Sequence, residues 1–212
     1  MSFMPGGLGA KRPARPRVGR VTEPPRLTSG ARDGRPTAAD LAAAKDAIIP
    51  DVIADGLRVL FCGINPGLYS AATGHHFARP GNRFWPALHQ GGFTSRLLRP
   101  DQQDQLLALQ LGITNVAARA TARADELDAD ELREGGRILA AKVARLGPRW
   151  LAIAGVTAYR TAFGRAGAVV GPQQDMLEGA RLWVLPNPSG LNAHWRPAAL
   201  AAEFERLRVA SN

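Results

Sequence analysis

Short apolar runs alternate with helix-like patterns along most of the chain. Four runs have the length and the β-branched or aromatic content of buried strands: 58–64, 111–115, 150–154 and 182–185. Six segments show the periodicity, the capping residues or the stop signals of helices: 37–49, 82–90, 101–109, 130–146, 157–163 and 196–209. Strands that are apolar on both faces and separated by helices indicate a parallel sheet covered on both sides. We therefore predict an α/β fold, a three-layer α/β/α sandwich around a short, mainly parallel sheet of about four strands.

Two glycines interrupt the most regular of these helical patterns. Segment 130–146 places Leu132 and Leu139 on one apolar stripe, yet it carries Gly135-Gly136 near its start. Each glycine costs about 1 kcal/mol relative to alanine inside a helix. A close approach of another backbone segment would justify that cost.

Positive charge is concentrated at the N-terminal end of the sequence. The net charge is +9, and residues 1–38 hold eight basic and two acidic side chains, so they carry +6 and leave +3 for the other 174 residues. The same residues include six prolines and six glycines. This composition predicts a disordered basic arm over 1–36 and one folded domain over 37–212. The arm is either an electrostatic tether to nucleic acid or a solubilising extension, and composition does not decide between them.

Composition also excludes several classes of protein and site. One cysteine in 212 residues rules out a disulfide framework and any four-cysteine zinc or iron–sulfur site within the chain. No stretch approaches the roughly 20 apolar residues of a membrane helix. The N-terminus shows no apolar segment followed by a small-residue cleavage site. We therefore expect no membrane association and a cytoplasmic protein, associated with the nucleoid if it is bacterial.

Two unusual loops follow predicted strands. Gly63–Gly67 follows the first strand, and Asn187–Asn192 follows the fourth. Because ligands bind outside the carboxyl ends of parallel strands, both loops should face one cleft. Neither loop has the spacing of a P-loop, a dinucleotide-binding turn or a nucleophile elbow. The loops hold no pair of carboxylates, and the four histidines lack metal-binding spacing, so we expect no metal.

Asn65 is the candidate for chemistry in the first loop. A side-chain amide cannot act as a base, but its carbonyl oxygen can hold a water while its NH₂ group donates elsewhere. Such a group suits a reaction whose leaving group departs as a tolerable anion, as a flipped uracil does. Asn-Pro-Gly is also good turn chemistry, so a purely structural turn is the alternative for this motif taken alone.

Several motifs, in order and spacing, resemble the mismatch-specific uracil/thymine DNA glycosylase family of the uracil-DNA glycosylase superfamily. The likeness runs from about Leu57 to Val209, roughly seven-tenths of the chain. It rests on Gly63-Ile64-Asn65-Pro66-Gly67, Ser70, Phe77, Asn82-Arg83-Phe84-Trp85, Arg133-Glu134-Gly135-Gly136-Arg137 and Asn187-Pro188-Ser189-Gly190-Leu191.

The resemblance implies a role for each motif. Asn65 would position the attacking water, and Gly67 would leave room for modified pyrimidines. Phe77 would stack on the flipped base, and Ser70 would line the pocket, with Ile64 and Asn187 as further substrate-binding candidates. In the second loop, Leu191 would act as a wedge in the duplex. Its neighbours would contact DNA: Pro188, Ser189, Gly190 and Asn192.

Two features depart from the family pattern, and one further residue is a candidate for the chemistry. His75-His76 lies in the segment that would cover the pocket, where we interpret both as surface imidazoles near a phosphate. The segment after Leu191 lacks an arginine, so His194 is a candidate for supplying that DNA contact. Asp125 is a candidate carboxylate to assist Asn65, although a solvated loop acid is the commoner role of such a residue.

The sequence thus predicts a monofunctional DNA glycosylase that removes uracil, preferably from G·U mismatches, and needs no cofactor. Its partner would be duplex DNA containing G·U or related mismatches, and the protein would be a monomer. Neither loop contains a lysine that could form a Schiff base. Two alternatives stay open: a mismatch-binding protein with little or no catalysis, and a hydrolase of free nucleosides or nucleotides.

Overall fold

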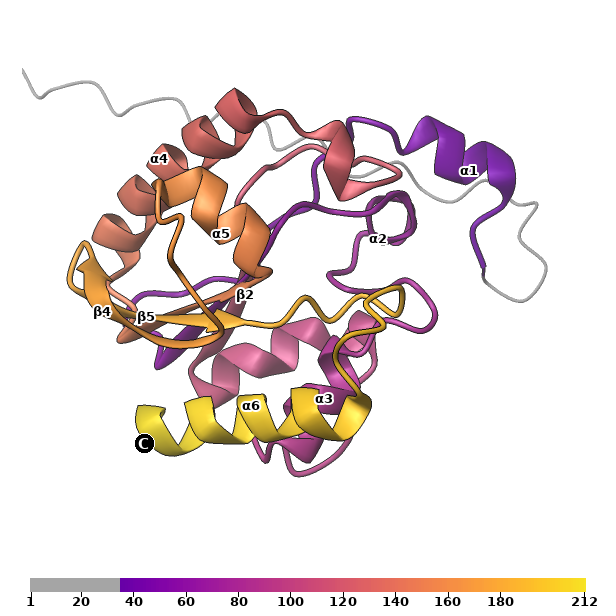
Figure 1. Cartoon of the computed structure of the whole chain (residues 1–212). Coiled ribbons are helices and arrows are strands. Elements are labelled where there is room, and N and C mark those ends of the chain that lie inside the picture. The colour runs from indigo at the N-terminus through magenta and orange to yellow at the C-terminus, as the bar shows by residue number, and fades with distance from the viewer. Residues whose placement is uncertain (1–34) are drawn as a thin grey trace, which may run out of the picture.

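The computed structural model describes residues 35–212 and has a five-stranded sheet at its centre (Figure 1). The strand order is β2-β1-β3-β5-β4. Four strands run parallel to one another: β1 (Val59–Gly63), β2 (Leu111–Asn115), β3 (Trp150–Ala154) and β5 (Ala180–Leu185). These are the four predicted strands, so the α/β fold with a mainly parallel sheet is confirmed.

The fifth strand, β4 (Gly171–Leu177), was not predicted. It pairs antiparallel with β5 at the edge of the sheet, and most of its residues are exposed. Its sequence Gly-Pro-Gln-Gln-Asp-Met-Leu lacks the apolar run that marks a buried strand. The strand forms because β5 offers it an edge, which is a tertiary cause with no local signal.

Alternating side chains of β1, an interior strand, divide the core between the two faces of the sheet. Val59 and Phe61 of β1 point into one apolar cluster, and Leu60 and Cys62 into the other. The first cluster is covered by α3 (Phe84–Gln90), α6 (Pro197–Ser211) and the 3₁₀ helix Pro100–Leu109. The second is covered by α4 (Ala129–Leu146) and α5 (Val156–Phe163). Figure 1 shows the resulting three layers.

Some helix boundaries differ from the predictions. The predicted helix 37–49 is shorter, because α1 covers only Ala38–Ala43, although its predicted capping box between Thr37 and Asp40 is present. The chain then leaves the helix through Asp46, whose φ is +60°. Segment 101–109 is 3₁₀ rather than α-helical, and the short α2 (Leu68–Thr73) was not predicted.

The two glycines of α4 are explained by close backbone contacts. A Cβ atom added to Gly135 would lie 2.4 Å from the carbonyl oxygen of Val116, and one added to Gly136 would lie 2.7 Å from that of Ala162. The expected close approach is therefore confirmed at both positions. Helix α4 rests directly on the segment that follows β2, which borders the cavity described below.

Two further sequence-based expectations concern the ends and the surroundings of the chain. No helix among residues 35–212 combines the length and apolar character required to cross a membrane. Almost all of the predicted arm over 1–36 lies outside the described residues, so its disorder and its boundary with the domain over 37–212 stay predictions.

Candidate active site

A cavity of about 600 Å³ opens at the carboxyl edge of the sheet, where both unusual loops meet. It is bounded by the loops after β1 and β5, by the segment after β2 and by the segment around Phe77. Most candidate site residues line it: Ile64, Asn65, Gly67, Ser70, Phe77, Asp125, Asn187, Pro188, Ser189 and Leu191. Gly190 and Asn192 belong to the same loop but do not line the cavity. The sheet thus brings together loops that are more than a hundred residues apart in the sequence.

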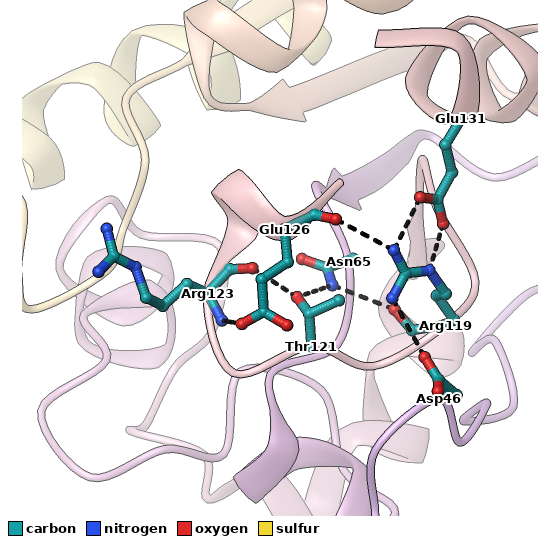
Figure 2. Close-up of polar contacts among 7 residues, drawn as sticks. All are labelled: Asp46, Asn65, Arg119, Thr121, Arg123, Glu126 and Glu131. Atoms are coloured by element: carbon teal, nitrogen blue, oxygen red, sulfur yellow. Dashed lines mark hydrogen bonds and ion pairs between the residues drawn. The ribbon is translucent and has the colours of Figure 1, made fainter. Parts of the chain in front are cut away.

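Asn65 is held by its amide nitrogen. Its Nδ2 donates to the carbonyl oxygen of Arg119 at 3.1 Å and to Oγ1 of Thr121 at 2.7 Å. Figure 2 shows the nitrogen turned toward these partners and the oxygen turned away from them. Asn65 lines the cavity and is half-buried, so its Oδ1 remains available as an acceptor. This is the arrangement required for an amide that holds a water.

Gly67 leaves open space beside Asn65. It is exposed on the cavity wall, and a Cβ atom added there would meet no other atom within 4 Å. A larger side chain at this position would therefore project from the wall without a steric conflict in the protein. The absence of such a side chain leaves this part of the cavity wall open.

Phe77 is fixed by stacking and by the backbone beneath it. Its ring stacks on Phe84 with centroids 4.1 Å apart and planes 15° from parallel. A Cβ atom on Gly63 would approach the Phe77 ring to 3.2 Å, so the glycine permits the ring to lie over the end of β1. Ser70 accepts from the amide of Ala78 at 3.1 Å and so helps to fix this segment. The predicted pocket role of Ser70 is thus joined by a structural one.

The interpretation of His76 as a surface imidazole is wrong. His76 is only 2 % exposed, and its Nε2 lies 3.0 Å from the carbonyl oxygen of Pro50. Because that oxygen can only accept, Nε2 carries the proton, which leaves Nδ1 to face the amide of Asn115 at 3.4 Å. Burial lowers the pKa of His76, so the ring stays neutral near pH 7. His75, by contrast, is only partly buried.

Asn115 is a cavity residue that the sequence interpretation missed. It ends β2, and it lines the cavity beside the neutral ring of His76. A signal for it was present, because it is an amide at the end of a parallel strand, as are Asn65 and Asn187. Three amides from three strand ends therefore converge on one cavity.

The second loop is ordered by its own side chains. The amide of Ser189 donates to Oδ1 of Asn187 at 3.0 Å, and Nδ2 of Asn192 donates to the carbonyl oxygen of Asn187 at 3.0 Å. These bonds form a compact turn whose tip exposes 77 % of Leu191. Gly190 packs so closely on the backbone of Gly81 that an added Cβ would lie 2.6 Å from its carbonyl oxygen. An apolar side chain is thus presented to solvent from a preformed loop.

Arg83 is a second residue whose role the sequence interpretation missed. Its guanidinium donates to the carbonyl oxygens of Ser189 at 2.6 Å, of Asn192 at 2.9 Å and of Trp195. Its backbone amide donates to the carbonyl oxygen of Pro188 at 2.9 Å. Arg83 therefore fastens the loop that carries Leu191 to the start of α3. His194 is exposed beyond this loop.

Asp125 lies at the cavity wall but is engaged by another side chain. Its carboxylate forms a bidentate ion pair with Arg123, at 3.0 and 2.5 Å. Both side chains are largely exposed. No three histidine, cysteine, aspartate or glutamate side chains of residues 35–212 come together as a set of metal ligands.

Comparison with known protein families gives the cavity its context. Residues 50–208 match the sequence model of the Uracil DNA glycosylase superfamily. The chain belongs to the uracil DNA glycosylase superfamily. The matched segment contains the two unusual loops, the segment after β2 and the segment around Phe77.

A solved structure has a similar fold. The solution NMR structure of a protein from Methanosarcina acetivorans, described as a "putative Uracil DNA glycosylase", aligns with a TM-score of 0.52. The alignment covers 77 % of this chain and 98 % of the other, at 18 % sequence identity. At this identity the likeness concerns the fold, so the DNA glycosylase superfamily assignment rests on the sequence match.

Proposed function

We propose that the protein is a monofunctional DNA glycosylase that hydrolyses the N-glycosidic bond of deoxyuridine, preferably opposite guanine, and leaves an abasic site. The observation that carries this proposal is the free acceptor face of Asn65 in the cavity, with both amide hydrogens already bound elsewhere. We further propose that it acts as a monomer in the cytoplasm, on nucleoid DNA if the source is bacterial.

The proposed chemistry is hydrolysis without a covalent intermediate. The C1′–N1 bond breaks and uracil takes the bonding electrons as an anion, while the oxygen of a water bonds to C1′ and its proton is released. Oδ1 of Asn65 accepts a hydrogen bond from this water and holds it against C1′. No lysine lines the cavity among the described residues, which agrees with a hydrolytic rather than an imine route.

The cavity walls suggest how the base is received. Phe77 offers a ring face for stacking, and the amide of Asn115 offers both a donor and an acceptor to the edge of the base. Gly67 leaves space near the pyrimidine, so 5-substituted and other modified pyrimidines are further candidate substrates. We keep Asp125 as the candidate assisting carboxylate, although it must first separate from Arg123.

Single-turnover cleavage tests the proposal directly. Enzyme in excess is mixed with duplexes of one sequence carrying G·U, A·U or G·T, and with single-stranded uracil DNA, and alkali then converts abasic sites into strand breaks. We expect the fastest cleavage at G·U. Duplex binding without cleavage would instead favour a mismatch-binding protein, and activity on free deoxyuridine would favour a nucleoside hydrolase.

Leu191→Ala should slow cleavage of A·U more than cleavage of G·U. Extruding a base costs a few kcal/mol, least at a mismatch, and an apolar wedge offsets part of that cost. We expect a loss of about tenfold or more on A·U and a clearly smaller one on G·U in single-turnover assays. Val209→Ala is the matched control, because Val209 is an exposed apolar residue near the C-terminal end of α6, far along the chain from the loop. Equal losses of rate on the two substrates would contradict the proposed role of Leu191 as a wedge.

Deleting residues 1–36 should weaken DNA binding and flatten its dependence on salt. Those residues carry most of the net positive charge, and each phosphate contact adds close to one unit to the slope of log affinity against log salt. The single-turnover rate at saturating enzyme should change little, because the cavity lies wholly within 37–212. Fluorescence anisotropy with an undamaged duplex at several salt concentrations measures the slope; an unchanged slope would show that the arm is no tether.

A further inference from the structure

We propose that Thr121 and Arg119 are positioning residues that fix the orientation of the Asn65 amide. Thr121 borders the cavity but is only 1 % exposed, and Arg119 does not line it; in our scheme both act through Asn65. The inference rests on the proposed function, because the orientation matters only if Oδ1 of Asn65 holds the attacking water.

Hydrogen-bond polarity at the two partners dictates the orientation of the amide. The carbonyl oxygen of Arg119 can only accept. The hydroxyl of Thr121 donates its single hydrogen to the carbonyl oxygen of Arg123, at 2.7 Å. Toward Asn65 this hydroxyl oxygen can therefore act only as an acceptor. A flipped amide would set Oδ1 against two acceptors and leave both hydrogens of Nδ2 without these partners. The nitrogen must therefore face this pair, which commits Oδ1 to the cavity.

The side chain of Arg119 holds its own carbonyl oxygen in place. The guanidinium binds both carboxylate oxygens of Glu131, at 2.5 and 2.9 Å, as well as Asp46 at 3.1 Å and the carbonyl oxygen of Glu126 at 3.1 Å. The Glu131 carboxylate raises the pKa of Arg119, so the guanidinium stays charged. We call Arg119 with its partners Glu131, Asp46 and Glu126 the clamp. Figure 2 shows these bonds running from the Arg119 guanidinium to Glu131, Asp46 and Glu126, and the separate bond from the Arg119 carbonyl oxygen to Asn65. The clamp ties the first turn of α4 and the segment after α1 to the carbonyl that receives Asn65.

Backbone contacts join the two cavity segments as well. The amide of Thr121 donates to the carbonyl oxygen of Pro66 at 3.2 Å, and Gly67 and Thr121 form an isolated bridge. The residues just after Asn65 are therefore bound to the same segment that binds its side chain. A shift of this segment would move the backbone and the amide of Asn65 together.

The first test removes the Thr121 hydroxyl while keeping the shape of the side chain. Thr121→Val should lower the single-turnover rate on G·U at saturating enzyme about tenfold to a hundredfold, since small misplacements at a reacting centre have effects of this size. Thr121→Ser, which keeps the hydroxyl, should restore the rate to within about threefold of wild type. Affinity for a duplex with an uncleavable 2′-fluoro-deoxyuridine should stay unchanged in both variants. A rate for Thr121→Val equal to that of wild type would overturn the inference.

A double-mutant cycle separates positioning from a general structural role. If Thr121 acts through the amide, Thr121→Val should have no further effect on the rate of Asn65→Ala. Independent, multiplying losses would show that Thr121 does not act through Asn65. If Thr121→Val fails to fold, the clamp still provides a test: Glu131→Gln should slow cleavage several-fold. Its matched control is Glu134→Gln on the same helix. The Glu134 carboxylate pairs with the exposed Arg137, so this variant should leave the rate unchanged.

One measurement needs no catalysis. In the DNA-free protein, the side-chain NH₂ hydrogens of Asn65 should exchange slowly with solvent by NMR, and faster in Thr121→Val. Slow exchange that is insensitive to Thr121→Val would contradict the inference even in an active enzyme. If the wild-type protein cleaves no uracil substrate while the exchange behaves as expected, the proposed function fails and the described hydrogen bonding stands.

Discussion

Asn65→Ala should abolish most of the uracil-excising activity while leaving duplex binding nearly intact. Removing the amide takes away the acceptor that holds the water against C1′. It also removes the hydrogen bonds that Asn65 donates to the carbonyl oxygen of Arg119 and to the hydroxyl of Thr121. Losing one well-placed polar group at a reacting centre costs on the order of 10²–10³ in rate. We expect a fall of this size in the single-turnover rate on G·U duplexes at saturating enzyme.

The affinity of Asn65→Ala for duplex DNA is the control that separates a loss of catalysis from a loss of binding. Affinity for a G·U duplex with 2′-fluoro-deoxyuridine should stay within about threefold of wild type, because Leu191, the loop 187–192 and the arm carry the proposed duplex contacts. Thermal unfolding should confirm that the variant is folded. Activity surviving in Asn65→Ala would move the chemistry elsewhere, and Asp125→Asn would then be the next variant to assay.

Gly135→Ala should destabilise the domain even though alanine is the better helix former. Alanine in place of glycine gains about 1 kcal/mol of helix propensity. The new Cβ atom, however, would lie 2.4 Å from the carbonyl oxygen of Val116. The carbonyl of Val116 cannot move away freely, because hydrogen bonds hold the backbone on both sides of it. The amide of Val116 donates to the carbonyl oxygen of Gly63 at 2.9 Å, and the amide of Ala117 donates to that of Ile64 at 2.8 Å. Overpacking of this kind costs typically about 1–3 kcal/mol, so a net loss should remain.

Chemical and thermal denaturation should measure this loss. The net loss is then about 1 kcal/mol, and for a domain of this size it corresponds to a fall of roughly 2–4 °C in Tm. Gly167→Ala is the matched control, because a Cβ atom there meets nothing within 4 Å. It should be neutral or slightly stabilising. A Gly135→Ala variant as stable as the control would mean that α4 can move away from the segment after β2 at little cost.

The sequence by itself determined the layers of the fold and the edge at which the site lies. Each parallel strand is buried on both faces, so its local sequence is an apolar run, and the chemistry-bearing loops follow where such runs end. That reasoning located Asn65 and Asn187 correctly at one cavity. Applied to the end of β2, the same reasoning could have found Asn115.

The tertiary structure decided the features that depend on contacts between residues far apart in the sequence. β4 exists because β5 offers an edge, and His76 is buried because Pro50 and Asn115 close around it. Asn65 and Thr121 are 56 residues apart, so no local pattern could reveal which face of the amide is occupied. Local sequence reports which side of an element is apolar, whereas the direction of a hydrogen bond is set by the groups that packing brings opposite it. The sequence therefore supplied the amide, and the packing of the segment after β2 against the first loop turned its oxygen toward the cavity.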